Sequence, residues 1–463
     1  MAEAADLSVA DAAALIARRA LSAPELCDSY LARIARRDQR LNAYLHVDAD
    51  AVRRAAATRQ NLIDRSGPAS PLDGIPIAVK DIIDVAGQRT SSHSAVTENH
   101  VASRDAAVVE RLRENGAIIL GKTALHEFAI GGPCFDLPWP PARNPWDVTR
   151  HPGGSSSGSG AAVAAGMAAA ALGTDTAGSV RNPATCCGLY GLKPTAGAIS
   201  RRGVFPLAFS LDAVGPITRR VEDMALIFAA LAQPDPDPAG SRAHPHHGRL
   251  YPIAQGITGM TLGLVRRFHR DAPETEAVMA ENFEQTAAAF AALGARLVEI
   301  DLPPLADWAN CTRVIQQSEA YSIHRPWLES QPERYCAISR QKLLPGAFLR
   351  AIDYIEALKA RRVLTAILDD AFSRCDVMLC VSSMTVPCRL DDPEAIRTTY
   401  EKQARLPFSL SGHPALAFPT GFTADGLPLG QQLVAPAWRE DLLFRFAQTY
   451  EKAHPWHERR PPC

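Results

Sequence analysis

The chain has 463 residues and a formal net charge of −1, from 49 Lys and Arg against 50 Asp and Glu. This balance excludes a strongly basic nucleic-acid binder and a protein held on an anionic membrane by charge. Hydrophobic residues make up 47% and charged residues 21%, which is typical of a globular protein with a large core, built as up to about three domains or as one large α/β domain.

The first part of the chain is predicted to be helical. Ser22 and Glu25 form a predicted capping box, with Pro24 in the first turn of the helix that follows. After these helices, a β-branched segment bounded by Gly74 and Gly87 predicts a buried strand. The expected helices cover residues 9–20, 25–38 and 48–63.

Helices and strands then alternate. A helix over 106–115 is stopped by Gly116 and followed by a strand, and the same pattern recurs around Gly294. This alternation predicts an α/β fold with a β-sheet layered by α-helices. The last strands are expected to complete the sheet that begins near residue 75; they cover 376–383, 413–422 and 427–436.

The predicted organisation is a single large domain with a helical lobe. We divide it into N-terminal helices, a core, a mostly helical lobe, and C-terminal strands with a helix. The corresponding ranges are 1–62, 63–231, 232–374 and 375–463.

The ten cysteines are scattered and include no CxxC pair, so we expect reduced thiols in a cytoplasmic protein. No signal peptide and no apolar run of 18 or more residues is found, so neither secretion nor membrane insertion is expected. His244, His246 and His247 lie in a Pro- and Gly-rich connection over 232–257, which predicts a solvated loop rather than a metal site.

The sequence GGSSSGSGAAVAAG, from Gly153 to Gly166, allows four interpretations. A flexible linker is disfavoured because the run passes directly into small apolar residues. A phosphate-binding loop would need a Lys that is absent. A hydrolase elbow is compatible with Gly154–Gly158, Asp376 and His413, but the Pro-rich segment before it cannot be a central strand.

The fourth interpretation joins this run to two distant features. Lys80 lies inside an apolar strand, where full burial would depress its pKa by ~3–5 units; alternatively, its amine reaches water at the strand end. The second feature is the segment 173–184, in which small residues precede Ser179. Their backbone N–H groups can converge as in an oxyanion hole, or can form an ordinary turn.

Together these segments resemble the amidase signature family. The likeness includes Gly-Ile-Pro-x-x-x-Lys-Asp ending at Asp81, the Gly/Ser run, Gly-Thr-Asp-Thr-Ala-Gly-Ser-Val-Arg around Ser179, and Gly-Leu-Tyr-Gly-Leu-Lys-Pro-Thr ending at Thr195. The chain departs from the family at Ala177 and Ser157, where glycine is common.

The resemblance implies a mixed central β-sheet sandwiched between α-helices, with a catalytic core over 63–231 and the helical lobe on its substrate side. It also implies a Ser-cisSer-Lys catalytic set. Ser179 would be the nucleophile, Ser155 the proton relay after a cis peptide bond from Gly154, and Lys80 the neutral general base. The oxyanion hole would use the backbone N–H groups of Thr176, Ala177, Gly178 and Ser179. The supporting groups would be Ser156, Asp175 and Arg181.

The implied activity is hydrolysis of a small amide without a metal or organic cofactor. The loop before the Gly/Ser run is a candidate acyl pocket that would favour apolar or aryl groups, although its side chains could equally pack the loop in place. Its residues are Gly131, Gly132, Cys134, Phe135, Leu137 and Trp139. The alternatives are an aryl ester or carbamate hydrolase, and the glutamine-hydrolysing A subunit of a tRNA-dependent amidotransferase. We expect a small-molecule substrate, no direct contact with nucleic acid or membrane, and leave a homodimer open.

Overall fold

The computed structural model describes residues 3–236, 241, 245, 251–401 and 403–462. Within them, eleven strands form one sheet in the order β1-β3-β2-β4-β6-β5-β10-β11-β9-β7-β8. The strands are β1 Tyr44–His46, β2 Pro76–Lys80, β3 Ile118–Thr123, β4 Ala170–Asp175, β5 Tyr190–Lys193, β6 Ala213–Thr218, β7 Thr261–Val265, β8 Arg296–Glu299, β9 Val377–Val381, β10 Ala415–Phe422 and β11 Pro428–Val434.

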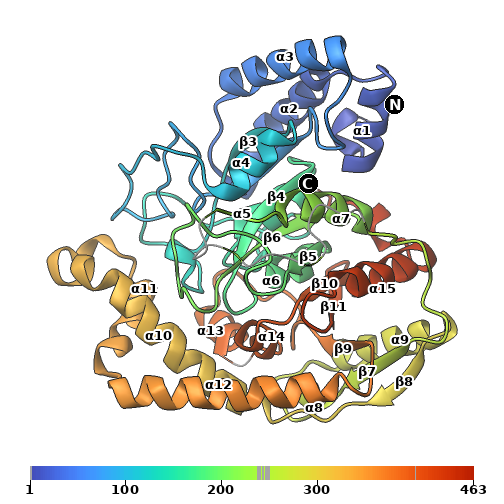
Figure 1. Ribbon diagram of the computed structural model, residues 1–463. Helices are drawn as coiled ribbons and strands as arrows, with labels where there is room; N and C mark the ends of the chain where they lie inside the picture. The colour runs from blue at the N-terminus through green and yellow to red at the C-terminus, as the bar shows by residue number, and fades with distance from the viewer. Residues whose placement is uncertain (1–2, 237–240, 242–244, 246–250, 402, 463) are drawn as a thin grey trace.

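Helices flank this sheet, as predicted (Figure 1). Those of the N-terminal half are α1 Val9–Ala17, α2 Ala23–Leu41, α3 Ala49–Ser66, α4 Ala107–Glu114, α5 Ser157–Ala164, α6 Arg181–Cys187 and α7 Val221–Leu231. Those of the C-terminal half are α8 Arg267–Arg270, α9 Ala277–Ala292, α10 Leu305–Ser330, α11 Ala337–Leu343, α12 Ala351–Ala371, α13 Pro393–Glu401, α14 Leu406–Ser411 and α15 Glu440–Ala453.

Local signals in the sequence place the first elements correctly. The Ser22 and Glu25 side chains form the predicted capping box at the start of α2. Strand β2 pairs in parallel with β3 on one side and with β4 on the other, and all its residues are buried. A strand covered in this way needs apolar residues in sequence rather than alternation, which explains the segment before Lys80.

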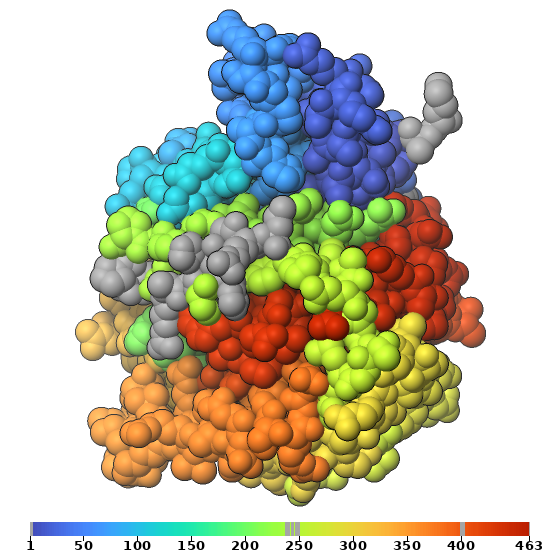
Figure 2. All heavy atoms as spheres, turned by 45° about the vertical axis from the view of Figure 1, so that its right-hand side comes forward, coloured from blue at the N-terminus to red at the C-terminus, as the bar shows by residue number. Residues whose placement is uncertain are grey.

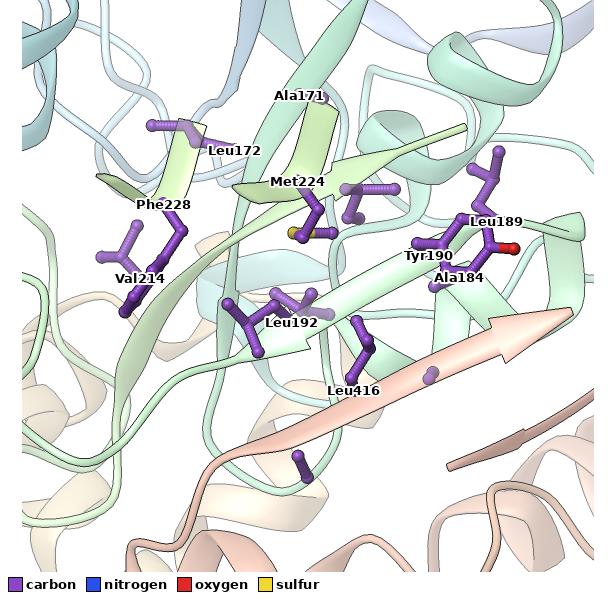
Figure 3. Packing of buried hydrophobic residues seen from close by; sticks show 14 of the residues in the cluster. Ala171, Leu172, Ala184, Leu189, Tyr190, Leu192, Val214, Met224, Phe228 and Leu416 are labelled. Atoms are coloured by element: carbon purple, nitrogen blue, oxygen red, sulfur yellow. The ribbon is translucent and has the colours of Figure 1, made fainter. Parts of the chain in front are cut away.

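The core lies between the central strands and the helices that cover them. Figure 3 shows Met224 and Phe228 of α7 beside side chains of β4, β6 and β5, including Leu172, Val214 and Leu192. All five of these residues are completely buried. Their packing fixes the strands whose ends carry the candidate site.

The C-terminal strands close the sheet as expected. Strand β10 pairs with β5, and β11 joins β10 to β9. The segment 232–374 also supplies strands, because β7 and β8 extend the sheet beyond β9. Several helices also belong to that segment. Helix α10 contacts α11, α12 and α14, and these helices lie at the end of the molecule away from α1–α3 (Figures 1 and 2).

One expectation about the cysteines is wrong. Cys134 and Cys336 form a disulfide that ties the loop after residue 130 to the start of α11. Their 202-residue separation gave no pairing signal in the sequence. No helix among the described residues is both long and apolar enough to span a membrane. His244, His246 and His247 lie outside the described residues.

Candidate active site

Lys80 ends β2 at the centre of the sheet and is completely buried. Its Nζ donates hydrogen bonds to Ser155 Oγ at 2.9 Å and to Thr174 Oγ1 at 2.7 Å. Burial lowers the pKa of Lys80 to about 7, although the negative charges of Asp212 and Asp175 oppose this shift. Near neutral pH a large fraction of this amine is therefore unprotonated and can accept a proton.

The Gly/Ser run enters α5, which begins at Ser157. The peptide bond between Gly154 and Ser155 is cis, as the resemblance implies. The backbone around Ser155 is held on both sides, because the Ser155 carbonyl accepts from the His126 N–H and the Gly154 N–H donates to Asn182 Oδ1. No strand precedes this turn, so it lacks the arrangement of a hydrolase elbow.

The glycines of this run allow close approach of neighbouring groups. A Cβ at Gly154 would lie 2.1 Å from the His126 ring, and one at Gly158 would lie 2.2 Å from the Ala43 carbonyl oxygen. Gly153 has a φ of +79°, which favours glycine. Glycine is therefore required here by crowding and backbone geometry, not by flexibility.

Ser179 lies in the turn between β4 and α6, 9% exposed. Its carbonyl accepts a hydrogen bond from the Ser156 N–H at 3.2 Å, which joins this turn to the one that carries Ser155. The Ser156 hydroxyl forms two hydrogen bonds with the backbone of Thr174. It donates to the Thr174 carbonyl and accepts from the Thr174 N–H. The structure thus brings Lys80, Ser155 and Ser179 into one buried region.

Asp175 and Arg181 brace the Ser179 turn. Arg181 Nε lies 3.0 Å from Asp175 Oδ2, and neither side chain is exposed. Burial opposes ionisation of Asp175, but the Arg181 guanidinium beside it holds the pKa of that carboxyl well below its usual range. Arg181 also donates to Gln432 on β11 and to Ser409 on α14. Its contacts are with protein groups of three elements, which fits a bracing role.

The four backbone N–H groups assigned to the oxyanion hole are not equivalent. The Gly178 N–H donates to Asp175 Oδ1 at 2.7 Å. Gly178 also takes the left-handed conformation of the turn, with a φ of +122°, while Ala177 has no positive φ. The alanine that replaces the common glycine at position 177 is therefore accommodated without backbone strain.

A cavity of about 240 Å³ opens beside Ser179. Thr176, Ala177 and Gly131 line it, together with residues of α10, α11, α13 and α14. The other residues of the predicted acyl pocket lie apart from its described lining; they are Gly132, Cys134, Phe135, Leu137 and Trp139. Phe135 is 62% exposed, and Cys134 is joined by its disulfide to Cys336 at the start of α11.

Glu127 lies next to that disulfide. Its carboxyl oxygen and the sulfurs of Cys134 and Cys336 lie within 4.8 Å of one another. Metals bind thiolates, and these sulfurs are joined to each other. The group is therefore no metal site in the oxidised protein.

Three residues of the site were not predicted from the sequence. Thr174 accepts a hydrogen bond from Lys80, and Asp212 influences the Lys80 charge from the end of the loop before β6. Burial raises the pKa of Asp212 to about 6, although hydrogen bonds from Thr176 and from backbone N–H groups oppose this. The His126 backbone holds Ser155. Thr174 could have been found from its place in the Ser179 motif; Asp212 and His126 could not.

Comparisons with known proteins agree with this geometry. The Amidase family model matches residues 25–444. The A subunit of the glutamyl-tRNA(Gln) amidotransferase of Syntrophobacter fumaroxidans is 36% identical over 96% of this chain and 97% of its own. The peptide amidase of Stenotrophomonas maltophilia superimposes with a TM-score of 0.86 at 30% identity, covering 98% of each chain.

The structure of a 6-aminohexanoate cyclic dimer hydrolase superimposes with a TM-score of 0.88 at 25% identity, covering 99% of each chain. The first of these structural neighbours is named as an amidase and the second as a hydrolase. The chain therefore belongs to the amidase signature family and is a hydrolase of amide carbon–nitrogen bonds.

Proposed function

We propose that the protein hydrolyses a small amide through an acyl-enzyme on Ser179. The observation that carries this proposal is the 2.9 Å hydrogen bond between the buried Lys80 amine and the Ser155 hydroxyl, next to the turn of Ser179. A serine hydroxyl is a weak nucleophile and needs a base to take its proton. Lys80, with its pKa lowered to about 7 by burial, is suited to that task near neutral pH.

In the first half of the reaction, Ser179 Oγ attacks the amide carbonyl. Its proton passes to Ser155 Oγ, while the Ser155 proton passes to neutral Lys80 Nζ. When the tetrahedral intermediate collapses, the carbon–nitrogen bond breaks and the same path returns the proton to the leaving amine. Water then attacks the acyl-enzyme by the same route, releasing the acid and restoring Ser179.

The negative oxygen of the intermediate would be bound by backbone N–H groups of the Ser179 turn. Thr176, Ala177 and Ser179 are the donors we propose, because the Gly178 N–H already donates to Asp175. Removal of one such donor typically costs roughly 10²–10³ in rate. Ser156, Asp175 and Arg181 would hold the turn in place through the hydrogen bonds described above.

The test is covalent labelling with a fluorophosphonate, followed by peptide mapping. We expect the label on Ser179, and Lys80→Ala should lower turnover by orders of magnitude in a folded protein. A label on Ser156 would overturn the assignment, and so would near-normal turnover of the Lys80 variant. Esters and carbamates present the same carbonyl to the nucleophile, so a panel of amides, esters and carbamates defines the preferred bond.

A second candidate is the glutamine-hydrolysing A subunit of a tRNA-dependent amidotransferase. It is favoured by the relatives of that name, whose identity to this chain extends over nearly the full length of both proteins. Hydrolysis of amides by the purified chain alone would support the independent amidase. Activity that requires partner subunits and tRNA, with glutamine as the amide, would support the second candidate instead.

A further inference from the structure

Glu127 is a completely buried acidic residue in the single helical turn Glu127–Ala129 after β3. Its Oε1 accepts a hydrogen bond from the Ser94 hydroxyl at 2.6 Å, and its Oε2 accepts one from the Cys336 N–H at 3.0 Å. No Lys or Arg side chain among the described residues forms an ion pair with it. Because a buried carboxylate is costly without a positive partner, this group either holds a proton or requires a cation.

The two cysteines of the disulfide bring sulfur to the same place. A carboxyl oxygen of Glu127 and the sulfurs of Cys134 and Cys336 lie within 4.8 Å of one another, and all three residues are buried. In the oxidised protein the two sulfurs are bonded to each other. Reduction gives two thiols, whose deprotonated form is a metal ligand, beside a carboxyl group.

The backbone spacing of the two cysteines suits both the disulfide and a shared metal ion. Their Cα atoms are 6.1 Å apart, within the range of ~4.4–6.8 Å that disulfides allow. Two thiolates that each lie ~2.3 Å from one tetrahedral ion are ~3.8 Å from each other. Rotation of the reduced side chains can supply that separation, so a shared ion is compatible with the backbone as it stands.

Neighbouring polar groups already orient these side chains. The Ser94 hydroxyl and the Cys336 N–H hold the carboxyl group of Glu127, and the Ser339 hydroxyl donates to it as well. The Ser339 hydroxyl also lies 3.2 Å from Cys336 Sγ. Metal ligands are typically held by such outer hydrogen bonds, which fix their direction. A carboxylate has about four lone-pair sites, so these bonds leave Glu127 able to bind an ion.

We infer that in the reduced protein Cys134, Cys336 and Glu127 bind one thiophilic divalent cation, with Zn²⁺ as the best match. Two thiolates favour such an ion over Mg²⁺ and Ca²⁺, which prefer oxygen ligands. Two thiolates and a carboxylate leave one net negative charge on the complex, as in Cys3His zinc sites, and water completes the tetrahedron. The inference goes beyond the proposed function and does not depend on it.

The change between the two states balances in electrons and protons. A dithiol reductant supplies the two electrons and two protons that break the sulfur–sulfur bond, and it is itself oxidised to a disulfide. The cation then binds both sulfurs and displaces the two thiol protons to solvent, together with the Glu127 proton where the carboxyl group holds one. A disulfide oxidant reverses both steps and releases the ion.

The ion would connect the same two segments as the disulfide. Gly131, three residues before Cys134, and Leu343 at the end of α11 both line the cavity beside Ser179. In the oxidised protein a covalent bond joins the loop to the start of α11. In the reduced protein the ion would replace that bond, so this side of the cavity would be supported in both redox states.

The test uses the full chain with Co²⁺ as a spectroscopic probe, since Co²⁺ bound to thiolates absorbs strongly in the near ultraviolet. Protein that is reduced with dithiothreitol and then freed of it under nitrogen should bind one Co²⁺ per chain with this absorption, and Zn²⁺ should displace the Co²⁺. Protein with its disulfide intact should bind none at the same concentrations. Zn²⁺ should also raise the thermal midpoint of the reduced protein alone, because a ligand stabilises the state that binds it.

Three variants test the ligands. Cys134→Ser, Cys336→Ser and Glu127→Gln should each weaken Co²⁺ affinity by at least roughly 10–100-fold, which is the cost of losing even an outer partner of a ligand. Cys311→Ser is the matched control. Cys311 is also buried and forms no disulfide, and its thiol donates to the Ala357 carbonyl, as a serine hydroxyl can. This variant should bind Co²⁺ like the wild type.

Three results would overturn the inference: no thiolate absorption in the reduced wild-type protein, equal binding by the oxidised protein, or binding that survives both Cys134→Ser and Cys336→Ser. The first two comparisons use the wild-type chain, so they decide the matter even where a variant fails to fold. Loss of binding in folded Cys311→Ser would also contradict the inference, because it would assign the ion to other cysteines.

Discussion

The ionisation of Lys80 gives the most direct test of the mechanism. Burial lowers its pKa from 10.5 to about 7. Because only the neutral amine accepts a proton, kcat/KM should rise about tenfold per pH unit below that pKa and level off above it. The assay is kcat/KM for a neutral amide from about pH 5 to about pH 9. A profile that is flat, or that rises only near the ordinary lysine pKa of about 10.4, would refute the assignment of Lys80 as the base.

The same shift links folding stability to pH. Below the native pKa of about 7, Lys80 is protonated in both states and burial of its charge opposes folding fully. Above that value the unfolded chain keeps the proton and the native protein loses it, so the unfolded state binds more protons and stability rises with pH. From about pH 7 to about pH 9, this gain is about 2 kcal/mol, at about 1.4 kcal/mol per pKa unit.

Lys80→Met isolates this contribution, since it removes the titrating group and keeps most of the side-chain volume. The free energy of unfolding is measured by urea denaturation for both proteins at both pH values. The free energy of unfolding of the wild type should increase relative to that of the variant by about 2 kcal/mol from the lower to the higher pH. The contributions of all other titrating groups are the same in both proteins and cancel in this comparison. A difference that does not change with pH would show that folding does not neutralise Lys80.

Three further predictions concern the catalytic turns. Ser179→Ala should abolish fluorophosphonate labelling and lower kcat by at least roughly 10³-fold, whereas Ser157→Ala at the start of α5 should keep both within a small factor. Gly154→Ala should lower the thermal midpoint of unfolding far more than Gly67→Ala. A Cβ at Gly154 would lie 2.1 Å from the buried imidazole of His126, whereas nothing lies within 4 Å of a Cβ at Gly67. Gly67→Ala should therefore lower the free energy of unfolding by only about 1 kcal/mol. Asp175→Asn should destabilise the fold by roughly 3–5 kcal/mol, since it leaves a buried guanidinium without its counter-charge.

Each of these has a result that contradicts it. Retained labelling in the Ser179 variant would place the nucleophile elsewhere. Equal midpoints for the two glycine variants, measured by calorimetry, would mean that the turn before Ser155 yields to a side chain. An Asp175 variant with wild-type stability would show that the Arg181 guanidinium finds other compensation.

The predictions from sequence succeeded where a structural element or a motif is specified by residues close together along the chain. The capping box of Ser22 and Glu25, the strand ending at Lys80 and the helix entered through the Gly/Ser run all depend on neighbours along the chain. The same is true of the motif around Ser179, in which small residues permit a tight turn. From these segments we predicted the mixed sheet. They also identified Lys80, Ser155 and Ser179, which the fold places in one buried region.

The lining of the cavity was harder to predict, because much of it comes from helices far away in the chain. The loop from Gly131 to Trp139 was expected to form the acyl pocket because it is apolar and precedes the Gly/Ser run. The disulfide of Cys134 joins this loop to the start of α11, and Phe135 is 62% exposed. Only Gly131 reaches the cavity beside Ser179.

The sequence by itself determined which side chains we propose as catalytic, because a base, a relay and a nucleophile require particular residue types in recognisable local settings. Only the tertiary structure decided their environment. Lys80 acquires its lowered pKa from burial under strands and helices far away in the chain. Likewise, the cavity beside Ser179 is lined by residues of α10, α11, α13 and α14. Charge, burial and cavity shape depend on which distant segments meet, and that information lies in the packing of the whole chain.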